Sequence, residues 1–344
     1  MGKRRISRKD VLTRRDFLKI SGLSAGTLAL GSLSNPPFSF AKEVYPADKI
    51  TFIVSHQAGG GHDTFARTIS PYISKYLKEI SPGAKGGEIQ IRNESAGGGR
   101  KGYSLLFNAR PDGYTIGIMD TAPITDNIVS GESEFDFTKL SFLLLGATIT
   151  KLVVTKSSFN SWNEVLTAMK KETLKMGVAQ FGRGNHISAI IMNEKLGTKF
   201  KLIPFVGSAD SMNALMRGDV PVAVAAEDAV TGLLDSKEIK VLLSFTEVSD
   251  YPGAVTIKDL GYPELVDQIN NHRFIVAPPG LPAETRDILI QAIKKATADK
   301  EFLDRAQKAK FHLRNIYGAD AEKMYLKFIK FFEEIAPTLK KNLK

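Results

Sequence analysis

The sequence contains no cysteine and a single tryptophan among its 344 residues. A chain without cysteine forms no disulfide, has no thiolate nucleophile and no Cys-ligated zinc, and carries no lipid on an N-terminal cysteine. After residue 41 it also lacks an apolar run of about 20 residues, the length that spans a bilayer. We therefore expect the processed chain to depend on its packed core and not to be inserted in a membrane.

The positive charge is concentrated near the N-terminus. The formal net charge is +10 at pH 7, and residues 1–41 hold eight Lys or Arg against two Asp, which accounts for +6. The remaining +4 is spread over residues 42–344, so the processed chain is only mildly basic. Composition therefore predicts no nucleic-acid partner.

Residues 1–41 have the pattern of an export signal. Arg14 and Arg15 precede an uncharged stretch at 20–33, which is typical of a twin-arginine signal peptide. Ser39 and Ala41 are small residues at the positions that a signal peptidase reads, so we predict cleavage after Ala41 and a periplasmic protein. An uncleaved anchor or a disordered basic arm is the alternative. Because twin-arginine export carries folded proteins, often with a cofactor inserted, an exported enzyme stays open at this point.

Strand-like and helix-like segments alternate along the rest of the chain. The expected strands are 50–55, 89–92, 114–119, 152–155, 175–179, 201–205, 220–226, 240–244 and 273–277. The expected helices are 64–77, 161–171, 187–195, 209–216, 229–234, 283–298 and 321–334. This alternation predicts parallel sheets with helices on both faces.

So many units fit two lobes better than one. We predict an α/β fold in which each lobe has a mostly parallel sheet flanked by helices, and in which the chain returns to the first lobe near its end. The expected division is a signal peptide at 1–41, lobe 1 at 43–145 and 255–344, and lobe 2 at 146–254.

A glycine-rich loop joins the first expected strand to the first expected helix. Gly59, Gly60 and Gly61 remove every Cβ and allow backbone N–H groups to approach a ligand closely. Such groups at a helix N-terminus suit an anion, and Asp63 or Thr64 can cap the same helix. A tight turn alone would need only one glycine, so the loop favours ligand contact.

Several segments resemble one family of periplasmic receptors. Residues 50–67 (ITFIVSHQAGGGHDTFAR) are similar to the opening of the substrate-binding proteins of tripartite tricarboxylate transporters, the Bug family. The resemblance continues through 93–99 (NESAGGG), 109–115 (ARPDGYT), 205–209 (FVGSA), 218–222 (GDVPV) and 277–283 (APPGLPA). Their order and spacing together are more specific than any one of them.

The resemblance implies a two-lobed periplasmic-binding-protein (Venus flytrap) fold with a carboxylate held by one loop from each lobe. We also expect a monomer that delivers its ligand to membrane transporter subunits or signals to a sensor kinase. The second-lobe loop should be 180–186 (QFGRGNH), although it is shorter than usual and carries an arginine. His62 and the pair Asn271 and His272 are further departures from the family pattern.

The expected ligand contacts are therefore Ala58, Gly59, Gly60, Gly61, Asp63, Asp120, Gly182, Arg183, Gly184, Asn185, His186, Val206, Gly207, Ser208 and Glu227. Arg183 either binds a carboxylate bidentately or is a solvated loop residue. His186 either caps its helix or contacts ligand. Asp120 and Glu227 lie just past strand ends, where capping a helix is the competing role.

Enzymatic readings have weaker support in the sequence. Residues 97–102 match G-x-G-x-x-G with Asp120 downstream, which keeps an exported NAD(P)-dependent oxidoreductase as the alternative function. The glycines do not follow their strand directly, and Pro111 shortens the next helix. The five histidines show no helical metal spacing. We therefore expect no cofactor, no metal and no catalysis.

Overall fold

The computed structural model describes residues 44–130 and 135–343. The predicted signal peptide at 1–41, with Arg14 and Arg15, lies outside these residues. Within them, no helix combines the length and the apolar character that crossing a membrane requires.

The first six-stranded sheet of the described chain has the order β12-β4-β11-β3-β1-β2. Its strands are β1 (Ile50–Val54), β2 (Ile89–Asn93), β3 (Thr115–Met119), β4 (Ser141–Ile149), β11 (Asn271–Ala277) and β12 (His312–Tyr317). Its helices are α2 (Gly61–Ile80), α3 (Arg100–Phe107), α4 (Ala122–Ser130), α10 (Ala283–Ala298), α11 (Lys300–Lys308), α12 (Gly318–Glu334) and α13 (Ala336–Asn342), with a short 3-10 helix at Phe137–Lys139.

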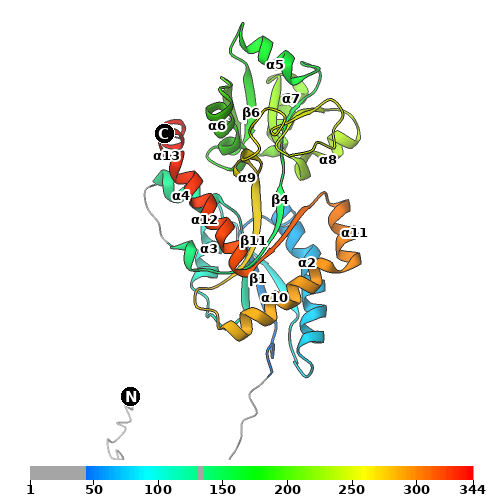
Figure 1. Ribbon diagram of the computed structural model, residues 1–344, viewed down its shortest axis with the longest axis vertical. Coiled ribbons are helices and arrows are strands. Elements are labelled where there is room, and N and C mark those ends of the chain that lie inside the picture. Colours follow the sequence, from blue (N-terminus) through cyan, green and yellow to red (C-terminus); the bar gives the residue numbers. More distant parts are fainter. Residues whose placement is uncertain (1–43, 131–134, 344) are drawn as a thin grey trace, which may run out of the picture. The chain divides into compact units, whose positions relative to one another are not determined.

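Helices cover both faces of the first sheet because its strands alternate apolar side chains between two cores. Ile50, Phe52 and Val54 of β1 pack in one cluster with residues of α2 and α10. Ile53 of the same strand belongs to the other cluster, together with residues of α3 and α12. Figure 1 shows α2 and α11 on one side of the strands and α3 and α12 on the other.

The second six-stranded sheet has the order β10-β9-β5-β8-β6-β7. Its strands are β5 (Lys151–Thr155), β6 (Lys175–Ala179), β7 (Lys201–Phe205), β8 (Val222–Ala226), β9 (Lys240–Ser244) and β10 (Val255–Thr256). Its helices are α5 (Trp162–Met169), α6 (Gly184–Leu196), α7 (Ser208–Arg217), α8 (Glu227–Asp235) and α9 (Leu265–Ile269). The buried side chains of α6 and of α7 belong to separate clusters on the two faces of this sheet.

The chain crosses between the two sheets at Thr150, after β4, and at Asn270, before β11. The side chain of Asn270 joins these crossings, because its Oδ1 accepts the backbone N–H of Lys151 at 2.7 Å. Its Nδ2 donates to the carbonyls of Phe245 and Val266 at 2.7 Å each. We call residues 44–149 and 271–343 the first lobe and residues 151–269 the second lobe.

These crossings differ from the expected limits at 145/146 and 254/255. The first limit lies inside β4, and β10, which begins at Val255, still pairs with β9 of the second sheet. The sheets are also mixed, not mostly parallel throughout. β5 is antiparallel to β8 and β9, and β11 is antiparallel to β3 and β4. The reason is the crossing itself, since a strand that enters a sheet from the other lobe runs opposite to strands that end at the cleft.

Candidate functional site

A cleft of about 520 Å³ lies between residues of the two lobes. Its walls are built where strands end and helices begin: Gly60 and Gly61 lie at the start of α2, Gly184 and Asn185 at the start of α6, and Ser208 at the start of α7. The expected placement of the ligand loops at the carboxyl ends of parallel strands is therefore met at this cleft.

The glycine-rich loop of the first lobe is held by Asp63. This buried carboxylate accepts hydrogen bonds from the N–H of Gly59 at 2.8 Å, from Arg67 at 2.9 Å and from Asn93 at 3.0 Å. Burial alone would raise the pKa of Asp63, but these three partners outweigh it and lower the pKa. Asp63 therefore shapes the loop and does not line the cleft.

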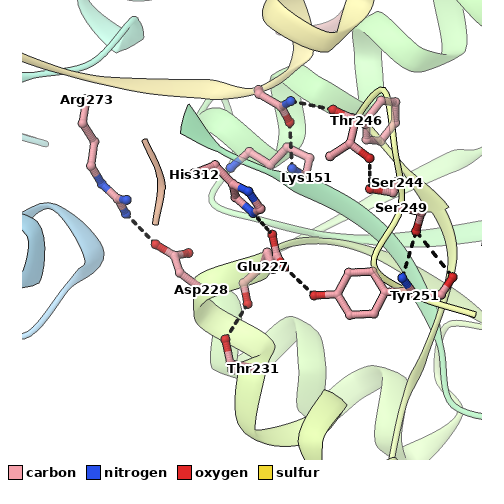
Figure 2. Close-up of polar contacts among 12 residues, drawn as sticks. Lys151, Glu227, Asp228, Thr231, Ser244, Thr246, Ser249, Tyr251, Arg273 and His312 are labelled. Carbon is pink, nitrogen blue, oxygen red and sulfur yellow. Dashed lines mark hydrogen bonds and ion pairs between the residues drawn. The ribbon is translucent and has the colours of Figure 1, made fainter. Parts of the chain in front are cut away.

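A buried ion pair joins the lobes beside Gly61. Nη2 of Arg273, on β11, lies 2.5 Å from Oδ2 of Asp228, in the first turn of α8 (Figure 2). The Arg273 side chain is 1% exposed and its guanidinium also lies over the rings of Phe65 and Phe311. A Cβ at Gly61 would overlap both charged groups. Glycine is required there because the ion pair lies against the backbone.

A second, half-exposed ion pair joins the lobes beside Gly98. Arg183, which precedes α6, donates from Nη1 to both carboxylate oxygens of Asp126 on α4, each at 2.8 Å. The two side chains are 29% and 25% exposed. A Cβ at Gly98 would lie 2.5 Å from Nη2 of Arg183. Arg183 is therefore not a free loop residue, since its guanidinium already holds a carboxylate of the opposite lobe.

The loop of the second lobe is closed by His186. Its Nδ1 accepts the N–H of Gly182 at 2.9 Å, and burial lowers the pKa of this imidazole, so His186 has the capping role. Asn185 lines the cleft and accepts from Nζ of Lys151 at 2.9 Å. A Cβ at Gly184 would lie 2.5 Å from the side chain of Asn271 in the first lobe.

Lys151 places a buried cation at the cleft. It is the first residue of β5, is 3% exposed, and lines the cavity together with Arg273. Burial lowers its pKa to about 8, although Asp228 and Asp120 act in the opposite direction. The ammonium therefore carries its charge at neutral pH and loses it readily above pH 8.

Glu227 is buried but does not line the cleft. Its two carboxylate oxygens lie 2.5 Å from Nε2 of His312, on β12, and 2.5 Å from the hydroxyl of Tyr251 (Figure 2). Burial raises the pKa of Glu227, but the hydrogen bonds from His312 and Tyr251 have the larger effect. The pKa of Glu227 is therefore below its usual value. The bond to Glu227 raises the pKa of His312. This pair also joins the two lobes.

Two histidines and an aspartate meet at the first-lobe wall. His56 follows β1, His62 is in the first turn of α2 and Asp120 follows β3, the parallel neighbour of β1. The imidazoles are stacked with centroids 3.7 Å apart and planes 2° from parallel, and each Nε2 lies 3.7 Å from Oδ2 of Asp120. Burial lowers the pKa of His62 well below its usual value. The spacing of histidines within one helix could not predict this cluster, because its three residues come from three separate segments of the chain.

The expected ligand contacts divide into two groups. Those that line the cleft are Gly60, Gly61, Asp120, Arg183, Gly184, Asn185 and Ser208. Those outside its lining are Ala58, Gly59, Asp63, Gly182, His186, Val206, Gly207 and Glu227. The second group mostly supports the loops, as Asp63 and His186 do, while Val206 is 87% exposed.

Sequence reasoning missed several charged and polar residues of the lining, among them His56, Lys151 and Arg273. Two of them carried a signal. Lys151 and Arg273 stand in the runs KLVVT and NHRFIVA, and a charged residue within a buried strand is rare unless it is paired or functional.

Comparison with known proteins decides the family. The model of the tripartite tricarboxylate transporter family receptor, TctC, matches residues 83–331. The chain belongs to this family. A protein of Agrobacterium vitis from the ttuE-ttuC' intergenic region is 24% identical over 311 residues, which cover 87% of this chain and 86% of that protein. The family consists of periplasmic solute receptors and not of enzymes.

Solved structures share the fold of this receptor. The Rpa4515 protein of R. palustris with adipate has a TM-score of 0.71 at 22% identity and covers 86% of this chain and 98% of its own. MatC of Rhodopseudomonas palustris with bound malate has a TM-score of 0.65 at 19% identity, with coverages of 87% and 100%. These likenesses confirm the two-lobed fold.

The glycines that match the dinucleotide-binding pattern have a structural role in this receptor. Gly97, Gly98 and Gly99 adopt left-handed backbone conformations before α3. A Cβ at Gly98 would meet Arg183 of the second lobe, and one at Gly99 would overlap the carbonyl of Ser55. They form a close-packed turn at the lobe boundary, and membership of a receptor family removes the case for a dinucleotide.

Proposed function

We propose that this TctC-family receptor captures a small carboxylate between its lobes. The observation that carries the proposal is the pair of buried cations, Lys151 from the second lobe and Arg273 from the first, which line one cavity. Buried cations are costly unless an anion offsets them. Asp228 offsets Arg273, whereas the Lys151 ammonium donates its hydrogen bond to the neutral amide oxygen of Asn185.

Helix N-termini reinforce the attraction for an anion. Residues at or just before the starts of α2, α4, α6 and α7, and residues in the first turn of α8, line the cleft. Each N-terminus carries a partial positive charge and unpaired N–H groups, and contributes about 0.3–1 kcal/mol toward a nearby anion. Adipate and malate in the two related structures are both dicarboxylates, which supports the same ligand class here.

Family membership supports a role in delivering the carboxylate. We propose that ligand favours the closed arrangement of the lobes, and that this form is recognised by membrane subunits of a tripartite tricarboxylate-type transporter or by a sensor kinase. The receptor would act as a monomer in the periplasm after twin-arginine export. Replacing Arg14 and Arg15 by lysine and fractionating the cells tests the export route, because an unchanged periplasmic yield contradicts it.

Thermal shifts with mono-, di- and tricarboxylates test the ligand class, since a ligand of the folded state raises its stability by RT ln(1 + [L]/Kd). Lys151→Met should weaken a carboxylate by about 1.5–3 kcal/mol, the worth of one charge-assisted hydrogen bond. Lys156→Met, at an exposed lysine of the same segment, is the matched control and should change nothing. Neutral sugars that shift the transition while carboxylates do not would overturn the proposal.

The pH dependence of affinity gives a second readout. A bound carboxylate holds the proton of Lys151 more tightly than the free cleft does, so binding takes up a proton above pH 8. Affinity should therefore fall as pH rises through about 8, the pKa of Lys151, and should fall less in Lys151→Met. An affinity that is equal at pH 7 and pH 9.5 counts against a role for this ammonium.

A further inference from the structure

The first-lobe wall of the cleft holds a cluster of side chains that has no role in the proposed function, in which cations capture a carboxylate. His56, His62 and Asp120 each offer a ligand atom, and these atoms lie within 4.8 Å of one another. The cluster comes from two adjacent parallel strands and the helix after the first of them, so its position is fixed by the sheet. All three residues line the cavity.

The polar atoms of the cluster are not satisfied by one another. Each histidine Nε2 lies 3.7 Å from Oδ2 of Asp120, which is too long for a hydrogen bond. Among the described residues, Nε2 of His62 and Nδ1 of His56 are buried without a hydrogen-bond partner. Oδ1 of Asp120 is occupied by the hydroxyl of Tyr103 and the N–H of Ala122. Buried polar atoms normally have partners, so the unpartnered Nε2 of His62, which lies beside Asp120, calls for a bound group.

We propose that His56, His62 and Asp120 bind a divalent transition-metal ion such as Zn²⁺ at the wall of the cleft. Two imidazoles and a carboxylate are a donor set that Zn²⁺ favours, and bonds of about 2.0–2.1 Å in tetrahedral geometry place neighbouring ligand atoms about 3.4 Å apart. The separation of 3.7 Å between each Nε2 and Oδ2, and of at most 4.8 Å among the three ligand atoms, has to contract to this value. Because the lone pairs lie in the ring planes, binding tilts the two rings toward the ion and opens their stack.

Three protein ligands leave one coordination position open, as in zinc sites that bind an exchangeable oxygen ligand. Here that position faces the cavity, so a ligand carboxylate can complete the site. Lys151 and Arg273 oppose a bare cation, and an anionic ligand offsets that opposition. The ion and a carboxylate should therefore bind cooperatively. This coupling rests on the proposed function, whereas the metal site itself rests only on the three side chains.

Metal binding is tested with Zn²⁺ or Co²⁺ alone on the purified, chelator-stripped receptor. Calorimetry should show one Zn²⁺ per chain, and Co²⁺ should develop the visible absorption of a four-coordinate site. Changes to outer-shell partners weaken metal sites by about 10–100-fold, so loss of a ligand in His56→Gln, His62→Gln or Asp120→Asn should weaken Zn²⁺ by at least about 100-fold. His56 is the safest of these positions for folding, because its side chain is 32% exposed.

His312→Gln is the matched control, since it removes a histidine that is paired with a carboxylate elsewhere, and it should leave Zn²⁺ binding unchanged. Absence of saturable binding overturns the site. Binding that survives equally in His56→Gln and Asp120→Asn shows an adventitious ion only. Carboxylate affinity measured with chelator present separates the two proposals: a carboxylate that binds without metal supports the proposed function even if the metal site fails.

Discussion

The two ion pairs at the cleft join the same lobes in different surroundings. Arg273 and Asp228 are 1% and 18% exposed, whereas Arg183 and Asp126 are 29% and 25% exposed. Each pair lies against a first-lobe glycine, Gly61 in one case and Gly98 in the other. Removing one partner of a buried pair leaves a charge out of water, whereas the partner in an exposed pair is rehydrated. The two ion pairs should therefore contribute unequally to the free energy of unfolding, although each joins an arginine to an aspartate.

The largest expected effect comes from neutralising the two acids in turn. Asp228→Asn should lower the free energy of unfolding by about 3 kcal/mol, because Arg273 remains buried without a counter-charge. Asp126→Asn should cost no more than about 1 kcal/mol, since Arg183 can turn to solvent. Urea denaturation with a common m-value measures both. Equal losses in the two variants would show that burial does not distinguish the pairs.

The glycine beside the buried pair gives the next largest effect. Gly61→Ala places a methyl group against Arg273 and Asp228, and overpacking of this kind costs about 1–3 kcal/mol. Gly232→Ala is the control, because that glycine is inside α8 with nothing within 4 Å of its added Cβ, and alanine should stabilise the helix by up to about 1 kcal/mol. A Gly61→Ala variant as stable as wild type would mean that the ion pair can move away at no cost.

A third contact between the lobes makes stability depend on pH. The raised pKa of His312 contributes stability below pH 6.5 that is lost as pH rises through that pKa. The pKa of Glu227 is lowered from 4.5 in the folded state, so this carboxylate contributes stability above pH 4.5. That stability is lost as pH falls through the lowered, folded-state pKa. The pair should stabilise the receptor most between these values. His312→Gln should remove the decline on the alkaline side, and an unchanged profile would contradict the assignment.

Particular strands show how much of the fold the sequence predicts. Each expected strand overlaps a strand of the structure, and helix α10 has the expected limits of 283–298. The nine-residue β4 was missed because its run SFLLLGATI is buried along nearly its whole length, so it lacks the alternation that marks a half-exposed strand. The missed β12, HLRNIY, is half-buried throughout and too polar to read as a core strand.

The site was less predictable than the fold because its partners are distant in sequence. Glycines at helix starts identified the loops, but their structural reasons lie elsewhere: Gly61 adjoins Arg273 and Asp228, and Gly184 adjoins Asn271. No local pattern indicates which side chain will approach from the opposite lobe. The sequence left open whether Arg183 binds a ligand carboxylate or is solvated, and the carboxylate that it holds in the structure belongs to Asp126.

Salt offers the smallest and most selective test of the two pairs. Exposed ion pairs are screened by salt, so the cost of Asp126→Asn, which is below about 1 kcal/mol, should shrink toward zero in molar salt. The cost of Asp228→Asn should persist, because ions do not reach Arg273. Parallel loss of both costs would show that water and ions penetrate the buried pair.

Asn270 has a mechanical consequence. Its amide ties the start of β5 to the start of β11, so the two strips of backbone that link the lobes are pinned to each other at one point. Two unconnected crossings would allow the lobes to twist and slide as well as to open. Because Asn270 joins the two crossings, we expect the lobes to open and close by rotation about a single hinge axis.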